Sequence, residues 1–545
     1  MKFSMAKLIS NIEKYEKYLF LLPIVFILKF AGYFAVPWDE PVQRLTGAVN
    51  LKYLVKRFGF IDLPNSAKTI PDLDLYPDKV FGPIFEIISI CFEWLFQITP
   101  KNNLLQGNSV TYSFRHFLTA LTCYLLSIYL YKLIALRYAN GIAFLVFISF
   151  WTTPKFISEA FYNSKDVLLL CILFPFLFYI YKYSRTQKTY TLFSASLFLG
   201  IAISIRLSIL LIFFTSIIFL VIQEKKQFKN ILKYVLGVIF TTIIVWPFLW
   251  QDPINNFIFA LKDMLNRNWN GKVLFDGKMI AADNLPWNYL LTWNLITIPI
   301  LILLGTVFAI ILLIVDLKKI RFINKCNLSF DYFILLTLIF YHFAFIVLKP
   351  TLYDGWRHYY FSYSLIMYLF AHGIFNIMNN RQKYLKKMAI VSIAIGVFVN
   401  CVHIKDSFPL SNLYFNEFVS KNNAHLSWEM DYWGTSNYKI LKKLSNYAEL
   451  GGIEKVTIST NQANPLYINL RMLRPNQAQI FEISNTFNSN TCLYLTNFRM
   501  ETDLPVDSMV LINQLKINGL TVGNLYANSN CSELWRKFSF KNITN

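Results

Sequence analysis

The sequence predicts an all-α polytopic membrane protein of about 11 transmembrane helices, followed by a small extracytoplasmic α/β domain. Of its 545 residues, 55% are hydrophobic and only 15% are charged, which is too apolar for a soluble protein of this length. Apolar runs near the roughly 20 residues that a spanning helix needs recur as far as residue 403. From residue 405 onward the charge is mixed. We therefore expect a membrane domain over 1–404 and a soluble domain over 405–545.

Each apolar run is flanked by charged residues or by Pro, Asn and Gly. The stretch 191–222 is interrupted only by Arg206 and is too long for one untilted helix, so we expect a hairpin of two spans with Arg206 at its turn. The predicted spans are 18–36, 114–131, 141–151, 167–181, two within 191–222, 231–250, 287–315, 332–348, 359–377 and 388–403.

The net charge of +21 reflects membrane topology, because the basic residues are spread over short loops. This distribution argues against a nucleic-acid partner. Six segments that face one side carry 21 Lys and Arg against 4 Asp and Glu: 1–18, 131–141, 182–189, 223–233, 316–325 and 379–387. The opposite loops 38–79 and 251–286 are balanced. The positive-inside rule then predicts a multi-pass membrane protein with the N-terminus in the cytoplasm and the C-terminal domain outside.

The first outer loop, 38–108, contains a predicted helix at 83–97. This segment is short for a span, and its polar residues share one helical face: Glu86, Ser89, Glu93 and Gln97. We expect a helix that lies in the membrane interface.

The C-terminal domain shows both helix and strand patterns. Ser436 can cap a helix whose apolar positions, Ile440, Leu441, Leu444 and Tyr447, follow helical spacing. Residues 456–459, 492–495 and 509–512 are predicted strands.

Five of the seven cysteines lie in or beside apolar runs, without the spacing of a structural zinc site. An oxidising outer compartment would permit a disulfide between the other two, Cys492 and Cys531.

The outer loops carry a mixture of acids, cations and His that the inner loops lack. Asp39 and Glu40 end the first predicted span, and each further group lies within a few residues of a helix end. These groups are Glu159, Asn163, Lys165 and Asp166, then Arg206, then 285–287, and finally 353–358. We expect all of them at one depth near the outer membrane face.

Such a set suits a transfer reaction from a lipid-linked phosphate. Arg and Lys neutralise the charge that grows on a departing phosphate, and a carboxylate can act as general base on an attacking hydroxyl. The sequence contains neither GxGxxG after a strand nor GxxxxGK[ST], which favours a donor carried by lipid rather than by a nucleotide.

The motifs that carry these residues resemble a known family. They read WDE at the first loop, SEAFYNSKD at the second, NLPWNYL before a later span, and YDGWRHYYF. They are similar to GT-C polytopic glycosyltransferases, closest to the protein O-mannosyltransferase and aminoarabinose transferase branch. The stretch DYWGTSNYKIL resembles bacterial members of that branch, which implies a bacterial inner membrane.

The resemblance implies an inverting single displacement from a polyprenyl-phosphate sugar. It assigns the general base to Asp39, with Glu40 beside it, and lets Asp166 orient Lys165 or the acceptor. The residues that match positions near the lipid phosphate are Lys165, Arg357, His358 and, less closely, Arg206. Some relatives bind a divalent metal near the acidic pair, so a metal near Asp39 stays open, and no other cofactor is expected. Eukaryotic protein mannosyltransferases have a His-Pro-Pro-Leu-type stretch where this chain reads VFGPIFE at 80–86, so a glycan, lipid or protein acceptor stays open.

Simpler interpretations exist for several of these residues. Lys165 and Asp166 could form an ion pair at a helix start worth about 0 to 1 kcal/mol. Arg206 could extend to the outer headgroups, and His358 could fill space at the interface. A transporter or flippase of lipid-linked sugars would share the many spans, but it should place ionisable residues at mid-membrane and show internal repeats. The chain shows no internal repeat.

Overall fold

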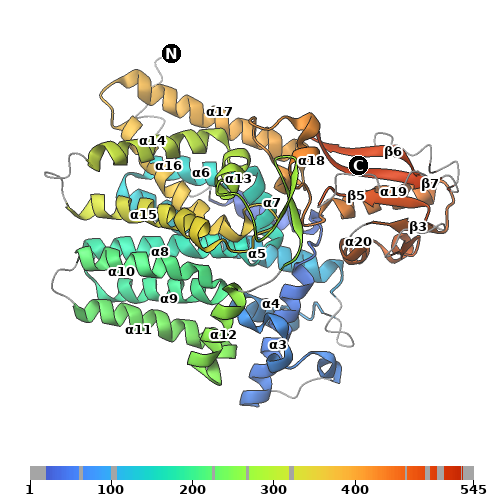
Figure 1. Cartoon of the computed structure of the whole chain (residues 1–545), viewed down its shortest axis with the longest axis horizontal. Helices are drawn as coiled ribbons and strands as arrows, with labels where there is room; N and C mark the ends of the chain where they lie inside the picture. Colours follow the sequence, from blue (N-terminus) through green and yellow to red (C-terminus); the bar gives the residue numbers. More distant parts are fainter. Residues whose placement is uncertain are drawn as a thin grey trace.

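The computed structural model of the chain describes residues 20–59, 65–99, 107–223, 228–265, 269–317, 325–460, 463–484, 491–499, 509–528, 531 and 535. The predicted inner segment 1–18 lies outside them. The described residues form a helical bundle with a sheet-containing domain at one end (Figure 1).

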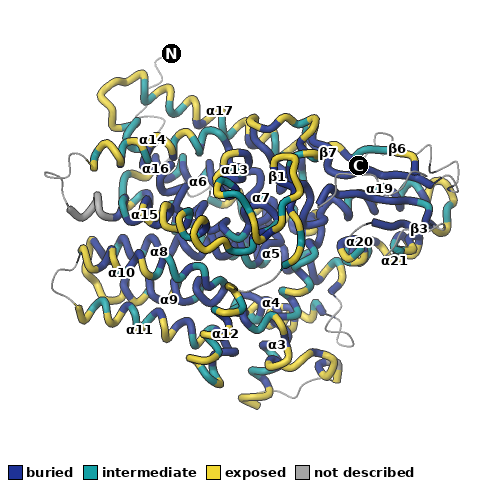
Figure 2. The backbone as a smooth tube through the Cα atoms, viewed as in Figure 1, coloured by how far each residue is buried: buried dark blue, intermediate teal, exposed yellow. Residues whose placement is uncertain are grey.

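The bundle is built from helices that follow the predicted apolar runs. They are α2 (Leu22–Phe30), α5 (Ser109–Arg137), α6 (Asn140–Trp151), α7 (Pro154–Tyr162), α8 (Asp166–Thr186), α9 (Thr189–Ile205), α10 (Leu210–Gln223), α11 (Phe228–Ile244), α13 (Tyr289–Thr297), α14 (Ile300–Leu317), α15 (Lys325–Leu348), α16 (Tyr363–Met378) and α17 (Lys383–Ser407). Helix α8 is buried along its length between α5 and α9. In contrast, α11 and α17 present exposed apolar side chains on the outside of the bundle (Figure 2). This pattern is that of a multi-pass membrane protein.

Within the described residues, six helices are long and apolar enough to cross a membrane, and the bent pair α6 and α7 would make a seventh. Helices α2, α9 and α10 are apolar but shorter. The predicted number of about 11 spans is therefore not confirmed. Arg206 has an extended backbone between α9 and α10, at the predicted turn of the hairpin.

One predicted span is broken at a proline, and another ends just before one. The 287–315 run divides into α13 and α14 because Ile298 precedes Pro299 and adopts an extended backbone. Thr153 likewise precedes Pro154, where α6 has ended and α7 begins, with an angle of 69° between the two helices. Helix α7 lies where the sequence predicted a loop. The bend directs α7 toward the end of the bundle where the C-terminal domain lies, and Ser158 on α7 donates a hydrogen bond to the Pro409 carbonyl (2.7 Å).

Buried charges lie at both ends of α5. Near its beginning, Arg115 contacts acids of the first outer loop. At its end, Arg137 pairs with the buried Asp331 of α15 (2.9 Å), which also accepts a hydrogen bond from Tyr368. The 22 residues from Arg115 to Arg137 span about 33 Å of helix. That length matches the roughly 30 Å thickness of a hydrocarbon core, so the two charge groups fit opposite membrane faces.

The first outer loop contains two helices, α3 (Glu40–Phe58) and α4 (Ile84–Leu95). The prediction of a helix at 83–97 is matched by α4, whereas α3 was not predicted. Glu86, Ser89 and Glu93 of α4 are buried against the protein. The two helices touch at Gly47, where an added Cβ would lie 2.5 Å from the Glu86 carbonyl oxygen.

The C-terminal domain contains a five-stranded mixed sheet in the order β4-β3-β5-β7-β6. Its strands are β3 (Val456–Ser459), β4 (Phe481–Ser484), β5 (Leu493–Thr496), β6 (Met509–Ile517) and β7 (Leu520–Asn528). β3 pairs in parallel with β4 and β5, and β7 is antiparallel to β5 and β6. The three predicted strands correspond to β3, β5 and the first part of β6. The sequence prediction missed β4 and β7.

Helix α19 (Ser436–Leu450) begins at the predicted residue, but Ser436 does not cap it. Instead, the Asp431 carboxylate accepts hydrogen bonds from the backbone amides of Thr435 (3.0 Å) and Ser436 (2.6 Å). Cys492 and Cys531 form a disulfide with a Cα–Cα distance of 5.0 Å. This bond ties β5 to the segment after β7.

Candidate active site

Asp39 and Arg357 form an ion pair at the end of the bundle next to the C-terminal domain. Asp39 immediately precedes α3, but its side chain makes no capping hydrogen bond. Its carboxylate lies 3.0 Å from Nη1 of Arg357, which begins the turn before α16. The Asp39 side chain is 33% exposed and that of Arg357 only 8%. A partly accessible carboxylate therefore lies against a buried guanidinium.

Asp354 holds the same guanidinium from its other side. Asp354 and Gly355 both have positive φ angles (60° and 67°), a tight turn that Asp-Gly pairs favour. This turn brings Asp354 Oδ2 to 3.2 Å from Nη1 of Arg357. Asp354 Oδ1 in turn contacts Nη2 of Arg499 (2.9 Å), a residue of the C-terminal domain. The four side chains Asp39, Arg357, Asp354 and Arg499 form a chain of alternating charge.

Aromatic rings enclose these arginines. The Arg357 guanidinium lies 4.9 Å from the Trp433 ring centroid and 5.1 Å from that of Tyr353. His358 packs its ring edge-to-face against Tyr353, and its Nε2 is 3.5 Å from Nε of Arg357. The rings exclude water and offer the guanidinium additional cation–π attraction.

Glu40 faces away from Asp39. Its carboxylate is buried, 3.0 Å from Nε2 of His116 and 3.8 Å from Nε of Arg115. Since α3 begins at Glu40, the two adjacent acids project in different directions. The predicted placement of Glu40 beside Asp39 in one site is not what the side chains show.

Glu40 belongs instead to a buried charge network under α3 and α4. Glu93 pairs with Arg44 (2.8 Å) and Arg115 (3.0 Å), and Arg115 also contacts Glu86. Burial would raise the pKa of Glu93, but Arg115 and Arg44 hold it below its usual range. This network fixes the first loop against α5.

Asp166 pairs with Arg206. Nε of Arg206 lies 2.8 Å from Asp166 Oδ1, and a second guanidinium nitrogen contacts the same oxygen. The Lys165 ammonium group instead lies 3.0 Å from the ring centroid of Phe81. The structure thus pairs Asp166 with Arg206 at the hairpin turn.

Sequence reasoning missed two members of the site. Asp354 appeared only as part of the 353–358 segment, and Arg499 was not considered. No local pattern around Arg499 signals a role, because its partner Asp354 is 145 residues away along the chain.

The residues present do not fit a metal centre at Asp39. Asp39 faces a guanidinium, and the nearest acid in sequence, Glu40, points elsewhere. Within the described ranges, no group of three or more His, Cys, Asp or Glu side chains could hold a metal ion. We therefore assign no step to a metal.

The arrangement can perform two chemical tasks. Because Asp39 is partly exposed, it can accept a proton from a group that approaches the site. Arg357 and Arg206, with Lys165 next to the Arg206 partner Asp166, can stabilise an anion at the same end of the bundle.

Residues 94–250 match a family model described as dolichyl-phosphate-mannose-protein mannosyltransferase. The match includes Lys165, Asp166 and Arg206 but neither Asp39 nor Arg357. For this part of the chain, the match agrees with the resemblance to glycosyltransferases of the mannosyltransferase type. No curated protein matches the sequence.

Several solved structures are similar. ArnT from Cupriavidus metallidurans bound to undecaprenyl phosphate has 10% sequence identity and a TM-score of 0.46, with 95% of this chain and 98% of that chain covered. Its apo form has 10% identity and a TM-score of 0.47, with coverage of 94% and 98%. The Archaeoglobus fulgidus oligosaccharyltransferase in complex with zinc and sulfate has 10% identity, a TM-score of 0.42 and coverage of 77% and 59%. Because these sequence identities and TM-scores are low, the structures assign no roles to residues of this chain.

Proposed function

We propose that this chain is a membrane glycosyltransferase that moves a sugar from a polyprenyl-phosphate-linked donor to an acceptor hydroxyl at the outer membrane face. The observation that carries the proposal is the ion pair between the partly exposed Asp39 and the buried Arg357. It joins a proton acceptor to an anion-binding group at the end of the spans. The family match over residues 94–250 supports the same reaction class.

The proposed reaction is a single displacement. The acceptor oxygen attacks the anomeric carbon of the sugar while the bond from that carbon to the phosphate oxygen breaks. Asp39 takes the acceptor's proton, and the polyprenyl phosphate leaves with the bonding electron pair. Attack opposite to the leaving group inverts the anomeric configuration.

Donor binding would release Asp39 from its ion pair. A donor phosphate that binds Arg357 competes with the carboxylates already there. Asp354 is fully buried and held by Arg499, whereas Asp39 is a third exposed. The phosphate therefore displaces Asp39 more readily than Asp354. The freed carboxylate can then accept the proton, so donor binding precedes base action.

We place the site on the outer face of a bacterial inner membrane, with the C-terminal domain in the periplasm. The positive inner segments support this orientation. The separation of the two charge groups along α5 supports a position of the site at one membrane face.

The test uses purified full-length protein and a panel of radiolabelled polyprenyl-phosphate sugars, offered with membrane glycan, lipid and protein acceptors. We expect transfer from at least one donor, and loss of this transfer in Asp39→Asn. Absence of transfer across the panel would contradict the proposal. Movement of an intact lipid-linked sugar across liposomes holding the protein, without transfer, would identify a flippase.

A further inference from the structure

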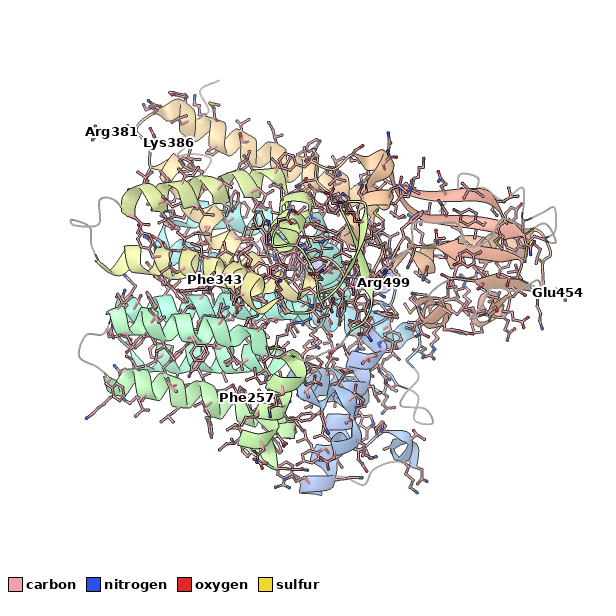
Figure 3. The ribbon with its side chains drawn as sticks, viewed as in Figure 1. Phe257, Phe343, Arg381, Lys386, Glu454 and Arg499 are labelled. Carbon is pink, nitrogen blue, oxygen red and sulfur yellow. A yellow bond between two sulfur atoms is a disulfide. The ribbon has the colours of Figure 1, made fainter. Side chains whose placement is uncertain are left out.

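Arg499 reaches out of the C-terminal domain into the candidate site. It follows β5 and is 1% exposed. Its Nε and Nη2 both contact Oδ1 of Asp354, at 3.1 and 2.9 Å. The guanidinium also lies 4.5 Å from the ring centroid of Trp38, the residue before Asp39. Figure 3 shows Arg499 at the junction of the bundle and the sheet domain. One side chain therefore contacts both segments that carry the site.

The C-terminal domain holds Arg499 in place. The Asn497 side-chain oxygen accepts a hydrogen bond from the Arg499 backbone amide (3.3 Å), and the Asn497 amide donates to the Asp431 carbonyl (3.3 Å). The Met430 amide donates to the Phe498 carbonyl (3.4 Å). Asp431 also caps α19. The position of Arg499 is thus fixed by the fold of its own domain.

The same domain holds the backbone that leads to Asp39. The side chain of Asn469 exchanges two hydrogen bonds with the backbone of Val36, each 3.1 Å long. The Trp38 amide donates to the Trp433 carbonyl (3.3 Å). Two of the three residues before Asp39 are therefore bound to residues beyond α17.

We propose that Arg499 is a positioning residue for the active site, and that the C-terminal domain completes the site through it. The two carboxylate oxygens of Asp354 have different partners: Oδ1 contacts Arg499, and Oδ2 lies near Arg357. Without Arg499, the buried Asp354 charge would have Arg357 as its nearest cation and would draw it away from Asp39. Arg499 thus keeps Arg357 shared between the two acids. This proposal rests on the proposed function.

Hydrogen–deuterium exchange of the intact protein tests the geometry without any assay of activity. We expect Arg499→Met to speed exchange in peptides covering 36–44 and 352–360. Arg474→Met should leave these peptides unchanged, because Arg474 is an exposed arginine of the same domain. Equal exchange in both variants would overturn the proposal, whatever reaction the protein catalyses.

Turnover tests the consequence for catalysis. We expect Arg499→Met to lower kcat about tenfold to a hundredfold while the donor KM changes little, since misplaced groups lose rate more than affinity. Arg499→Lys should lie between this variant and wild type, and it decides the question if Arg499→Met fails to fold. Wild-type-like kcat in the folded Arg499 variants would overturn the proposal. Inactive wild type would refute the proposed function alone.

A double variant distinguishes positioning from general stability. If Arg499 acts through Asp354, adding Arg499→Met to Asp354→Asn should cost little further kcat. If the kcat losses of the two single variants instead multiply in the double variant, Arg499 acts independently of Asp354, and the proposed route is overturned.

Discussion

Nη1 of Arg357 lies 3.0 Å from the carboxylate of Asp39, and the same nitrogen lies 3.2 Å from Asp354. One buried cation is thus shared by two acids with different accessibility. The more exposed acid can be displaced by an incoming anion, whereas the buried one anchors the guanidinium. This relationship makes the roles of the two acids experimentally separable.

Asp39→Asn should lower the single-turnover rate by about a hundredfold or more, the usual scale for a positioned base. Asparagine has nearly the same size but cannot take the acceptor's proton, so folding and donor binding should persist. Single-turnover rates over a range of pH provide the measurement. Glu40→Gln is the comparison, and it should affect stability more than rate because Glu40 is buried against His116. A larger rate loss in Glu40→Gln would transfer the role of base to that residue.

Arg357→Ala should weaken donor use more than acceptor use, because a charge-assisted contact of this kind is worth about 1.5 to 3 kcal/mol. Arg357→Lys should rescue only partly, since an ammonium group cannot replace a planar fork. The dependence of initial rate on donor concentration measures the effect. The exposed Lys278 supplies a control, Lys278→Ala. Unchanged donor dependence in both Arg357 variants would place the phosphate site elsewhere.

Reporter or single-cysteine tags test the orientation in the membrane. Tags at 185, 320 and 383 should be cytoplasmic, and tags at 270 and 480 should be external, because the inner segments carry the basic excess. Labelling of intact cells by a membrane-impermeant reagent reads out the side. A cytoplasmic tag at 480 would reverse the orientation, and the candidate site would then face inward.

Glu429 should make stability depend on pH. Burial, followed by the neighbouring Asp354 charge, raises the pKa of Glu429 from 4.5 to about 8. Below pH 4.5, folded and unfolded chains both hold the proton. Between pH 4.5 and about pH 8, only the folded chain keeps the proton on Glu429, so the contribution of Glu429 to stability falls as the pH rises. The unfolding temperature of Glu429→Gln, relative to that of wild type, should therefore rise as the pH increases over this range.

The exposed Glu482 on β4 gives a matched control for that experiment. Glu482→Gln should follow the wild-type pH dependence. A Glu429→Gln variant whose unfolding temperature runs parallel to wild type from pH 5 to 8 would show that Glu429 does not retain its proton in the folded state.

Asp331→Asn should destabilise the bundle. The change leaves Arg137 buried without its charge partner, and breaking a buried pair in this way costs about 3 to 5 kcal/mol. Thermal unfolding in detergent measures the loss. Asp406→Asn, an exposed acid at the end of α17, should leave the unfolding temperature nearly unchanged. Equal behaviour of the two variants would mean that the Arg137–Asp331 pair contributes little.

The sequence alone predicted much of the element pattern. Apolar runs, the hairpin turn at Arg206, the amphipathic α4 and the strand β3 are local features, set by composition and periodicity within about ten to twenty residues. The sequence also predicted that Asp39, Asp166, Arg206 and Arg357 lie at one end of the spans, because each is a charge close to the end of an apolar run.

The tertiary structure decided which of these charges meet. Asp39 and Glu40 are neighbours in sequence, yet the start of α3 between them turns one toward Arg357 and the other toward His116. Asp166 pairs with Arg206, which is 40 residues away in the chain, and Arg499 approaches Asp354 from another domain. A local pattern can place a charge at a depth, but its direction and partner depend on backbone packing between segments hundreds of residues apart. Ion pairing is short-ranged, so only the folded chain determines it.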